Sequence, residues 1–184
     1  EKSAALISAL ADRDAAYVYD SATVASAARD LLALKSVDRV HYATKANWNP
    51  ALLKLLHAAG VRMECVSRAE LDHVFTTLPG IRADEVLFTP NFAPRGEYEY
   101  ALAKGVNVTL DNLHALREWP QLFKGRRVLV RIDTGTGRGH HHHVRTAGTY
   151  AKFGVPLSEI EELKTLAKAT GATIFGLHAH TGSG

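Results

Sequence analysis

The sequence predicts an α/β protein whose parallel sheet is the first part of a (β/α)8 barrel. Two observations support this prediction. Short apolar runs rich in β-branched residues alternate with segments of helical periodicity, which is typical of parallel strands covered on both faces. Polar residues also stand where the apolar runs end. A barrel gathers the carboxyl ends of its strands at one face, where barrel enzymes place their chemistry.

Six apolar runs are the predicted strands, at residues 40–44, 61–66, 85–89, 106–110, 127–132 and 173–178. A further short strand is predicted at 17–19, ahead of a helix over about 22–35. An open doubly wound sheet would fit the same alternation. The G-x-G-x-x-G turn that favours such a sheet is absent after the first strand, so the barrel is the preferred topology.

Helix-boundary signals occupy the segments between the predicted strands. Asn49 and Pro50 suit the N-cap and the first position of a helix, and Gly60 suits its end. Other signals are capping-box spacings or cap residues before a short helix: Ser67 with Glu70, Ser158 with Glu161, and Asp111 with Asn112 before a helix through Trp119 that Pro120 ends. These signals divide the chain into regular strand–helix units.

Composition narrows the class of protein. The 184 residues are 46% hydrophobic and 22% charged, which excludes a disordered, collagen-like or coiled-coil chain. The net charge of +3 is too small to indicate a nucleic-acid partner. No apolar stretch is long enough to span a bilayer, so no membrane partner is expected. The single Cys65 excludes an internal disulfide, fits a cytoplasmic protein and is expected in the core.

Two predicted strand ends carry side chains suited to binding a cofactor. Lys45 ends an apolar strand, where burial would lower the pKa of its amine. A neutral amine can condense with a carbonyl, as lysines do with pyridoxal phosphate. Residues 178–184 offer a histidine for a flat ligand, and small residues with a serine hydroxyl for a phosphate. A snorkelling lysine and an ordinary Gly-Ser turn are the alternatives.

Four ordered segments resemble a known family. They are 42–47 (YATKAN), 64–71 (ECVSRAEL), 152–154 (KFG) and 180–183 (HTGS). These motifs are similar to those of the fold type III, pyridoxal-phosphate-dependent amino-acid decarboxylases, whose barrel is of the alanine racemase-like type. The group contains diaminopimelate, ornithine and arginine decarboxylases. Segment 86–94 and the glycine-rich loop after residue 133 most resemble diaminopimelate decarboxylases, including the decarboxylase part of chains fused to an aspartate kinase.

The resemblance implies a role for each matching residue. Lys45 would form an internal aldimine with pyridoxal 5′-phosphate, and His180 would stack on the cofactor ring. Ser183 and the backbone at Gly182 would bind the phosphate. Glu64 stands where relatives carry an acidic residue near the cofactor. No metal is expected to take part.

The implied reaction is decarboxylation of meso-2,6-diaminopimelate to L-lysine and carbon dioxide, a step of lysine biosynthesis. Two alternatives remain open: a decarboxylase of ornithine, arginine or a carboxylated polyamine, and a non-catalytic pyridoxal-phosphate-binding barrel. A racemase fits less well, because the His-x-Gly-Ser run suits the decarboxylases better. A plain structural barrel would leave Lys45 without a purpose.

The resemblance also implies a domain organisation. Residues 1–39 would lead into the barrel, and residues 40–184 would form its first six βα units. The rest of the barrel and a C-terminal β-domain would follow in the full-length, homodimeric protein. A barrel that stops after six strands leaves unpaired edges. We therefore expect these 184 residues alone to be poorly stable and inactive.

Two further polar features have open roles. Four consecutive histidines at 140–143 lie in a glycine-rich loop between Arg138 and Arg145. Adjacent histidines lack the one-face spacing of a preformed metal site. A basic loop that attracts a dicarboxylate is therefore the preferred interpretation. Glu70 would either line the pocket or only cap its own helix.

Overall fold

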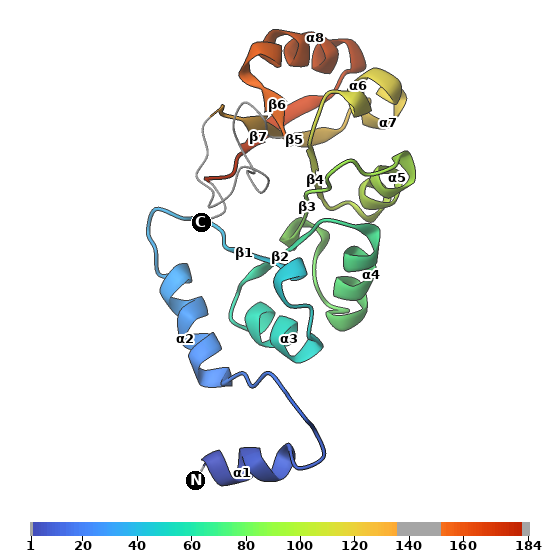
Figure 1. The fold of residues 1–184 in the computed structure, drawn as a ribbon. Helices are drawn as coiled ribbons and strands as arrows, with labels where there is room; N and C mark the ends of the chain where they lie inside the picture. Colours follow the sequence, from blue (N-terminus) through green and yellow to red (C-terminus); the bar gives the residue numbers. More distant parts are fainter. Residues whose placement is uncertain (1, 136–151, 182–184) are drawn as a thin grey trace.

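Seven parallel strands form one curved sheet in the computed structural model, which describes residues 2–135 and 152–181 (Figure 1). Neighbouring strands pair in the order β1 to β6, and β7 pairs with β5. The strands are β1 (His41–Ala43), β2 (Arg62–Cys65), β3 (Val86–Phe88), β4 (Asn107–Leu110), β5 (Arg127–Asp133), β6 (Val155–Pro156) and β7 (Thr173–His178). All six predicted apolar runs contain a strand. The sequence did not predict β6, because a strand of two residues is too short to show a periodic pattern.

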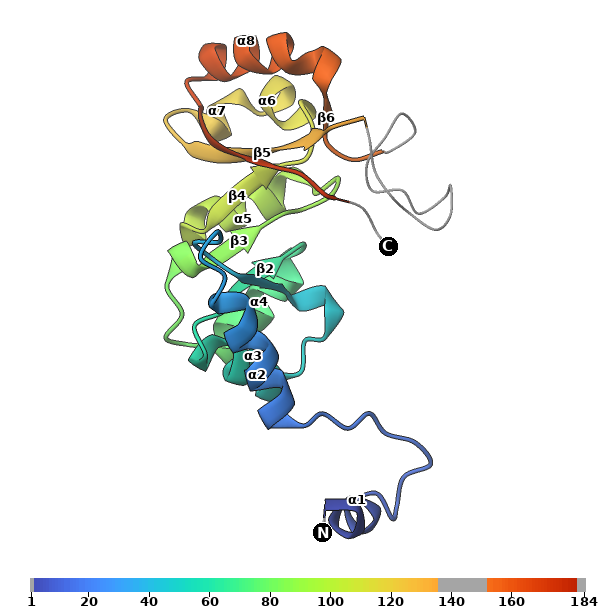
Figure 2. The same ribbon diagram turned by 90° about the vertical axis from the view of Figure 1, so that its left-hand side faces the viewer.

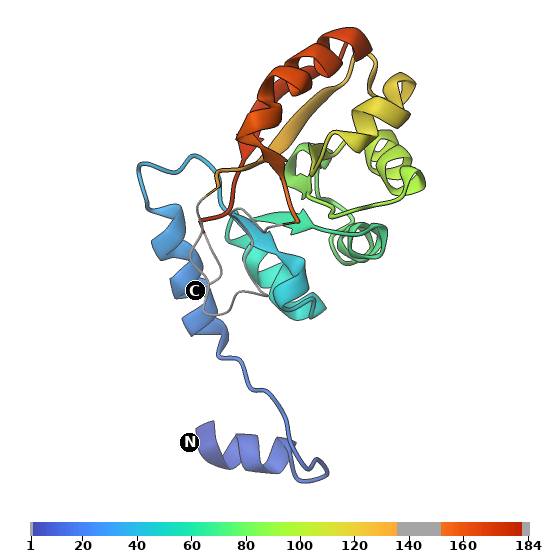
Figure 3. The same cartoon turned by 45° about the horizontal axis from the view of Figure 1, so that its top comes forward.

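Helices follow one another along the outer side of the curved sheet (Figure 3). They are α3 (Pro50–Ala58), α4 (Arg68–Thr77), α5 (Arg95–Lys104), α6 (His114–Glu118), α7 (Pro120–Phe123) and α8 (Ile160–Thr170), after α1 (Lys2–Ala9) and α2 (Ser21–Leu32). Short 3-10 turns are η1 (Thr44–Ala46), η2 (Ala83–Glu85) and η4 (Leu157–Glu159). Figure 2 shows α1 standing apart from the sheet. Among the helices described, none is long and apolar enough to cross a membrane.

The core lies between the sheet and its outer helices, because strand side chains alternate between the two faces. Along β2, Met63 and Cys65 are fully buried, whereas Arg62 and Glu64 are only half-buried. The core role expected for Cys65 is therefore confirmed. On the helix side, large side chains such as Leu53 of α3 complete the packing. The opposite, inner face is left to side chains such as Glu64.

The predicted start of α3 is confirmed, and one of the two hydrogen bonds of the capping box predicted for α4 forms. The Ala51 N–H donates to the Asn49 side chain (2.9 Å), and Pro50 opens α3. The Glu70 N–H donates to the Ser67 hydroxyl (3.3 Å), which caps α4. These bonds satisfy backbone donors that the first turn of a helix leaves free.

Two predictions about local structure are wrong. Residues 17–19 form no strand: Tyr17 and Tyr19 are exposed, and the segment pairs with no strand among the described residues. The β propensity of these tyrosines is not enough to form a strand, because no strand in the described part of the chain pairs with the segment. The capping box at Ser158 also does not form, since Ser158 lies in the η4 turn and α8 begins at Ile160. Glu161 instead pairs with Lys164 on the helix surface (2.7 Å).

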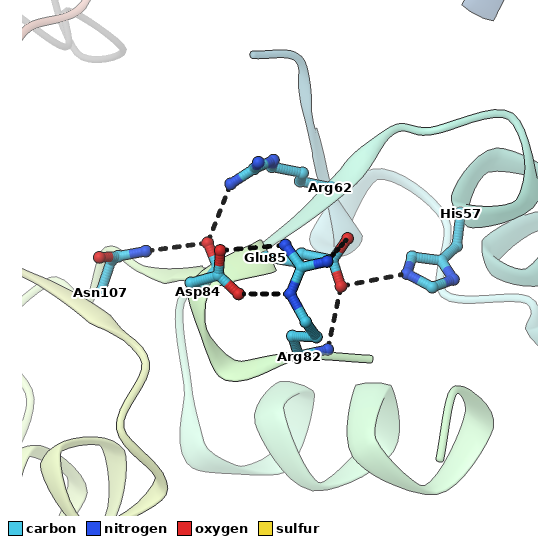
Figure 4. A network of polar contacts seen from close by, with 6 residues as sticks. All are labelled: His57, Arg62, Arg82, Asp84, Glu85 and Asn107. Carbon is cyan, nitrogen blue, oxygen red and sulfur yellow. Dashed lines mark hydrogen bonds and ion pairs between the residues drawn. The ribbon is translucent and has the colours of Figure 1, made fainter. Parts of the chain in front are cut away.

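A polar network ties together the amino ends of the strands (Figure 4). The Asp84 carbonyl in η2 accepts from the Arg62 guanidinium of β2 (3.0 Å) and from the Asn107 amide of β4 (3.1 Å). Arg82 binds the Asp84 carboxylate through two bonds, but both side chains are mostly exposed. The turn before β3 is thus fixed to the strands on both sides of it.

Replacing Asn107 tests which part of this network stabilises the fold. We expect Asn107→Ala to lower the free energy of unfolding by about 1 kcal/mol, because the Asp84 carbonyl loses a donor. Arg82→Ala should leave it nearly unchanged, because water screens an exposed ion pair. Urea unfolding of the full-length protein measures both. Equal losses in the two variants would contradict this ranking.

Candidate cofactor site

The carboxyl ends of the strands surround a cavity of about 320 Å³ on the inner face of the sheet. Lys45, Glu64 and His180, all singled out from the sequence, line it together. Arg131 and His178 line it as well. The structure therefore brings side chains from four different strand ends to one place, as expected for a barrel.

Lys45 lies in the η1 turn, directly after β1, and its side chain is exposed at the cavity. The expectation that an apolar strand buries this lysine is wrong, because the chain turns after Ala43 and carries the side chain out of the strand. The neighbouring Thr44 is buried and donates its hydroxyl to the Glu70 carboxylate (2.7 Å). This bond holds the turn that presents Lys45.

Glu70 links the turn after β1 to the turn after β2. Its carboxylate accepts the Thr44 hydroxyl and the Val66 N–H (2.9 Å). A full capping box would require it to accept from the Ser67 N–H instead. Glu70 therefore makes only half of that motif, and its side chain mainly fixes the position of η1.

Glu64 projects from β2 into the cavity and accepts a hydrogen bond from the Thr89 hydroxyl. Burial raises the pKa of Glu64 to about 7, with a further rise from the Glu70 charge, while the Lys45 charge opposes the shift. Its carboxyl group is therefore close to half-protonated at neutral pH. Such a group can hold or release a proton next to Lys45.

The raised pKa of Glu64 predicts a pH-dependent contribution to stability. Between pH 4.5 and about 7 the folded state keeps a proton that the unfolded state has released. This contribution is fully present below pH 4.5 and is lost as the pH rises through 7. We therefore expect Glu64→Gln to gain stability relative to the unmodified protein as the pH rises over this range.

Urea unfolding at several pH values checks the Glu64 prediction. The exposed Glu118 at the end of α6 provides the control variant, Glu118→Gln. A stability difference between Glu64→Gln and the unmodified protein that stays constant from pH 4.5 to 7 would contradict the expected protonation.

Two histidines at the end of β7 face the cavity side by side. The ring centroids of His178 and His180 lie 4.9 Å apart, with the planes inclined at 64°. Burial lowers the pKa of His180, and the Arg131 and Lys45 charges lower it further. Burial likewise lowers the pKa of His178, to about 4. Both imidazoles are therefore kept towards the neutral form, and a neutral ring can lie flat against an aromatic ligand.

Arg131 is a buried cation that the sequence reasoning missed. Its guanidinium donates to the Asn91 side chain (3.0 Å), lies 3.5 Å from the Asp111 carboxylate, and covers the Phe153 ring at 4.7 Å. Burial raises the pKa of Asp111, and the Arg131 charge opposes that rise. The available signal was an arginine between Val130 and Ile132, in the middle of an apolar run.

The predicted helix-capping role of Asp111 is wrong, because its carboxylate faces Arg131. Asp111 is 1% exposed and faces the Arg131 guanidinium inside the sheet. Its neighbour Asn112 accepts the His114 N–H (2.9 Å) ahead of α6. That helix ends at Glu118, and Pro120 begins α7 instead of only ending the segment.

Gly154 lets the segment after the loop approach β5. Its backbone has φ of +85°, and an added Cβ would lie 2.8 Å from the Asp133 nitrogen and 3.0 Å from the Ile132 carbonyl carbon. Only glycine tolerates both a positive φ and such a close approach of backbone atoms. This close approach sets the neighbouring Phe153 ring against Arg131.

A pair of glycine substitutions tests this close approach. Gly154→Ala should cost roughly 3 kcal/mol or more, because backbone atoms must move as well as φ. Gly125→Ala, at φ +68° with no atom within 4 Å of the added Cβ, should cost about 1 kcal/mol. Urea unfolding measures both values. Similar losses would show that the close approach adds nothing to the cost of positive φ.

Three features of the predicted site lie outside the described residues. They are Gly182 and Ser183, expected to bind a phosphate, and the histidine run 140–143. The described part of the cavity nevertheless fits a planar carbonyl cofactor. It holds an accessible amine, a flat imidazole, and a His178 Nδ1 that is buried without a hydrogen-bond partner among the described residues. Its volume lies within the usual range for small-molecule sites.

Fold and cavity together define an α/β protein of the barrel type with a candidate cofactor site at the carboxyl ends of its strands. Residues 22–184 match the model of the family described as "Pyridoxal-dependent decarboxylase, pyridoxal binding domain". The chain belongs to this family, and the resemblance seen in its motifs is confirmed. Pyridoxal phosphate is the cofactor of the family, as expected from the sequence.

Relatives and solved structures agree with this assignment. Diaminopimelate decarboxylase of Methanothermobacter thermautotrophicus is 35% identical over 148 residues, which cover 79% of this chain and 34% of that protein. Ornithine decarboxylase of Leishmania donovani is 29% identical over 147 residues, 79% of this chain and 20% of that protein. The crystal structure of diaminopimelate decarboxylase from Helicobacter pylori complexed with L-lysine gives a TM-score of 0.77 at 25% identity, covering 90% of this chain and 43% of that one.

The structural match confirms the predicted fold class. The seven-stranded parallel sheet with its outer helices corresponds to the N-terminal barrel portion of diaminopimelate decarboxylase structures. The chain spans about a third of the length of the Methanothermobacter relative. The cavity therefore belongs to the cofactor-binding part of the family's fold.

Proposed function

We propose that the whole protein is a pyridoxal-phosphate-dependent decarboxylase that converts meso-2,6-diaminopimelate to L-lysine and carbon dioxide. One observation carries this proposal: Lys45, Glu64 and His180, from three separate motifs, line a single cavity at the carboxyl ends of the strands. The similarity to several diaminopimelate decarboxylases supports this choice of substrate.

Lys45, His180 and Glu64 each have a task that their position at the cavity supports. When bound, the cofactor supplies an electron sink for the pair of electrons left as carbon dioxide departs. Lys45 presents its amine to the cofactor aldehyde from the exposed η1 turn. The neutral His180 ring would lie against the cofactor ring, and Glu64 can hold a proton near Lys45. Ser183 and Gly182 would bind the phosphate, a role that the resemblance of the HTGS motif to the family supports.

A second candidate is the same chemistry on ornithine, arginine or a carboxylated polyamine. The similarity to an ornithine decarboxylase favours keeping it. Carbon dioxide release from each amino acid, measured on the full-length protein, separates these substrates. A non-catalytic pyridoxal-phosphate carrier would bind the cofactor and release carbon dioxide from none of them.

The proposal extends to assembly and location. We place the full-length protein in the cytoplasm, which the free and buried Cys65 supports. We also propose a homodimer, which the resemblance of the motifs to the family supports. Sedimentation of the full-length protein tests this, and a monomer that retains full activity would refute it.

Borohydride reduction tests the role of Lys45. After incubation of the full-length protein with pyridoxal phosphate, peptide mapping should find one pyridoxyl adduct, on Lys45. Lys45→Ala should lose both the adduct and detectable turnover, because Lys45 is the only lysine among the described residues that line the cavity. The control Lys54→Ala changes an exposed lysine on α3 and should keep both. An adduct on another lysine, or turnover by Lys45→Ala, would overturn the proposal.

A further inference from the structure

His178 is the cavity residue whose role the proposed chemistry leaves open. It lies two residues before His180, on the same side of the chain, and its ring meets the His180 ring edge to face at 4.9 Å. The His178 Nδ1 atom is fully buried and has no hydrogen-bond partner among the described residues. The contact of its side chain within the cavity that the described residues show is the one between its ring and the His180 ring.

The strand that carries His178 is held closely against β5. An added Cβ at Gly176 would lie 3.2 Å from the Leu129 side chain, so a larger residue there would require that side chain to shift. The pairing register shifts by one residue between Val128 and Leu129. A shift of this kind re-aims the side chains that follow it. In the resulting register, His178 stands opposite Arg131.

Arg131 gives His178 a rigid neighbour. The guanidinium is fixed by the Asn91 side chain, by the Asp111 carboxylate and by the Phe153 ring. Burial, with the positive charges around the cavity, keeps the His178 ring neutral at physiological pH. The neutral His178 ring is not repelled by the Arg131 charge and can pack against the His180 ring.

The last link is the position of His180. It follows the end of β7, where ladder hydrogen bonds no longer hold the chain. The plane of its ring must therefore be set by side-chain contacts, and the His178 ring is the aromatic contact it has among the described residues. Side chains that face a ligand work best when a packed neighbour locks their rotamer.

We propose that His178 is a positioning residue that fixes the plane of the His180 ring against the cofactor. This inference rests on the proposed function, because it requires His180 to face pyridoxal phosphate. His178 acts through His180 and contacts no reacting atom. The contact is aromatic, so a phenyl ring should replace the imidazole whereas an aliphatic side chain should not.

Three variants of the full-length protein test this inference. His178→Leu should weaken the binding of pyridoxal phosphate about tenfold, as expected from the loss of one aromatic pair. It should also reduce the visible circular dichroism of the bound cofactor, which reports how firmly the ring is held. His178→Phe should keep both values. If thermal unfolding shows that His178→Leu is not folded, His178→Gln takes its place with the same expected losses.

The control is a matching pair outside the cavity. His114 meets the Trp119 ring at 5.1 Å with the planes at 86°, and it is exposed on α6. His114→Leu should change neither the affinity for pyridoxal phosphate nor the dichroism of the bound cofactor. A change as large as that of His178→Leu would mean that loss of any aromatic pair acts through general stability, and would overturn the inference.

Two other results would overturn the inference. Unchanged affinity and dichroism in His178→Leu would show that His180 needs no support. Equal losses in His178→Phe and His178→Leu would show that the aromatic contact is not what matters. Failure of the unmodified full-length protein to bind pyridoxal phosphate would refute the proposed function itself, which distinguishes the two failures.

Discussion

The alternation of side chains along parallel strands is the constraint on which this site depends. Helices cover only the outer face of the sheet, so every second residue packs into the core and the others face inward. In β2 this rule buries Met63 and Cys65 and leaves Glu64 to the cavity. A slip of one residue in the register of β2 would exchange these sides. The apolar core therefore fixes where the polar site residues point.

Arg131 converts this arrangement into a rigid cavity wall. A buried guanidinium requires partners, because an unpaired charge inside a protein is costly. Its partners come from segments far apart in the sequence: Asn91 after β3, Asp111 after β4, and Phe153 before β6. Gly154 makes the approach of the last segment possible. The same cation also favours neutral histidines beside it, so packing and electrostatics act in the same direction.

Sequence patterns predicted the elements better than the contacts between them. The apolar runs predicted every strand that is long enough to show periodicity, and Asn49 and Ser67 predicted the helix starts that follow them. These predictions succeed because the signals depend only on residues close together in the sequence. The two-residue β6 offered no such pattern. The tyrosines at 17 and 19 have high β propensity, but a strand needs a partner that propensity does not provide.

The sequence by itself determined the α/β class, the family and three of the residues that meet at the cavity, Lys45, Glu64 and His180. The order of the motifs and the alternation of apolar runs with helical segments can be read directly from the amino-acid sequence. Only the tertiary structure decided how these residues behave. It placed Lys45 on an exposed turn, raised the pKa of Glu64 through burial, and paired Asp111 with Arg131 instead of a helix end. Burial and charge pairing depend on segments distant in sequence, which no local pattern encodes.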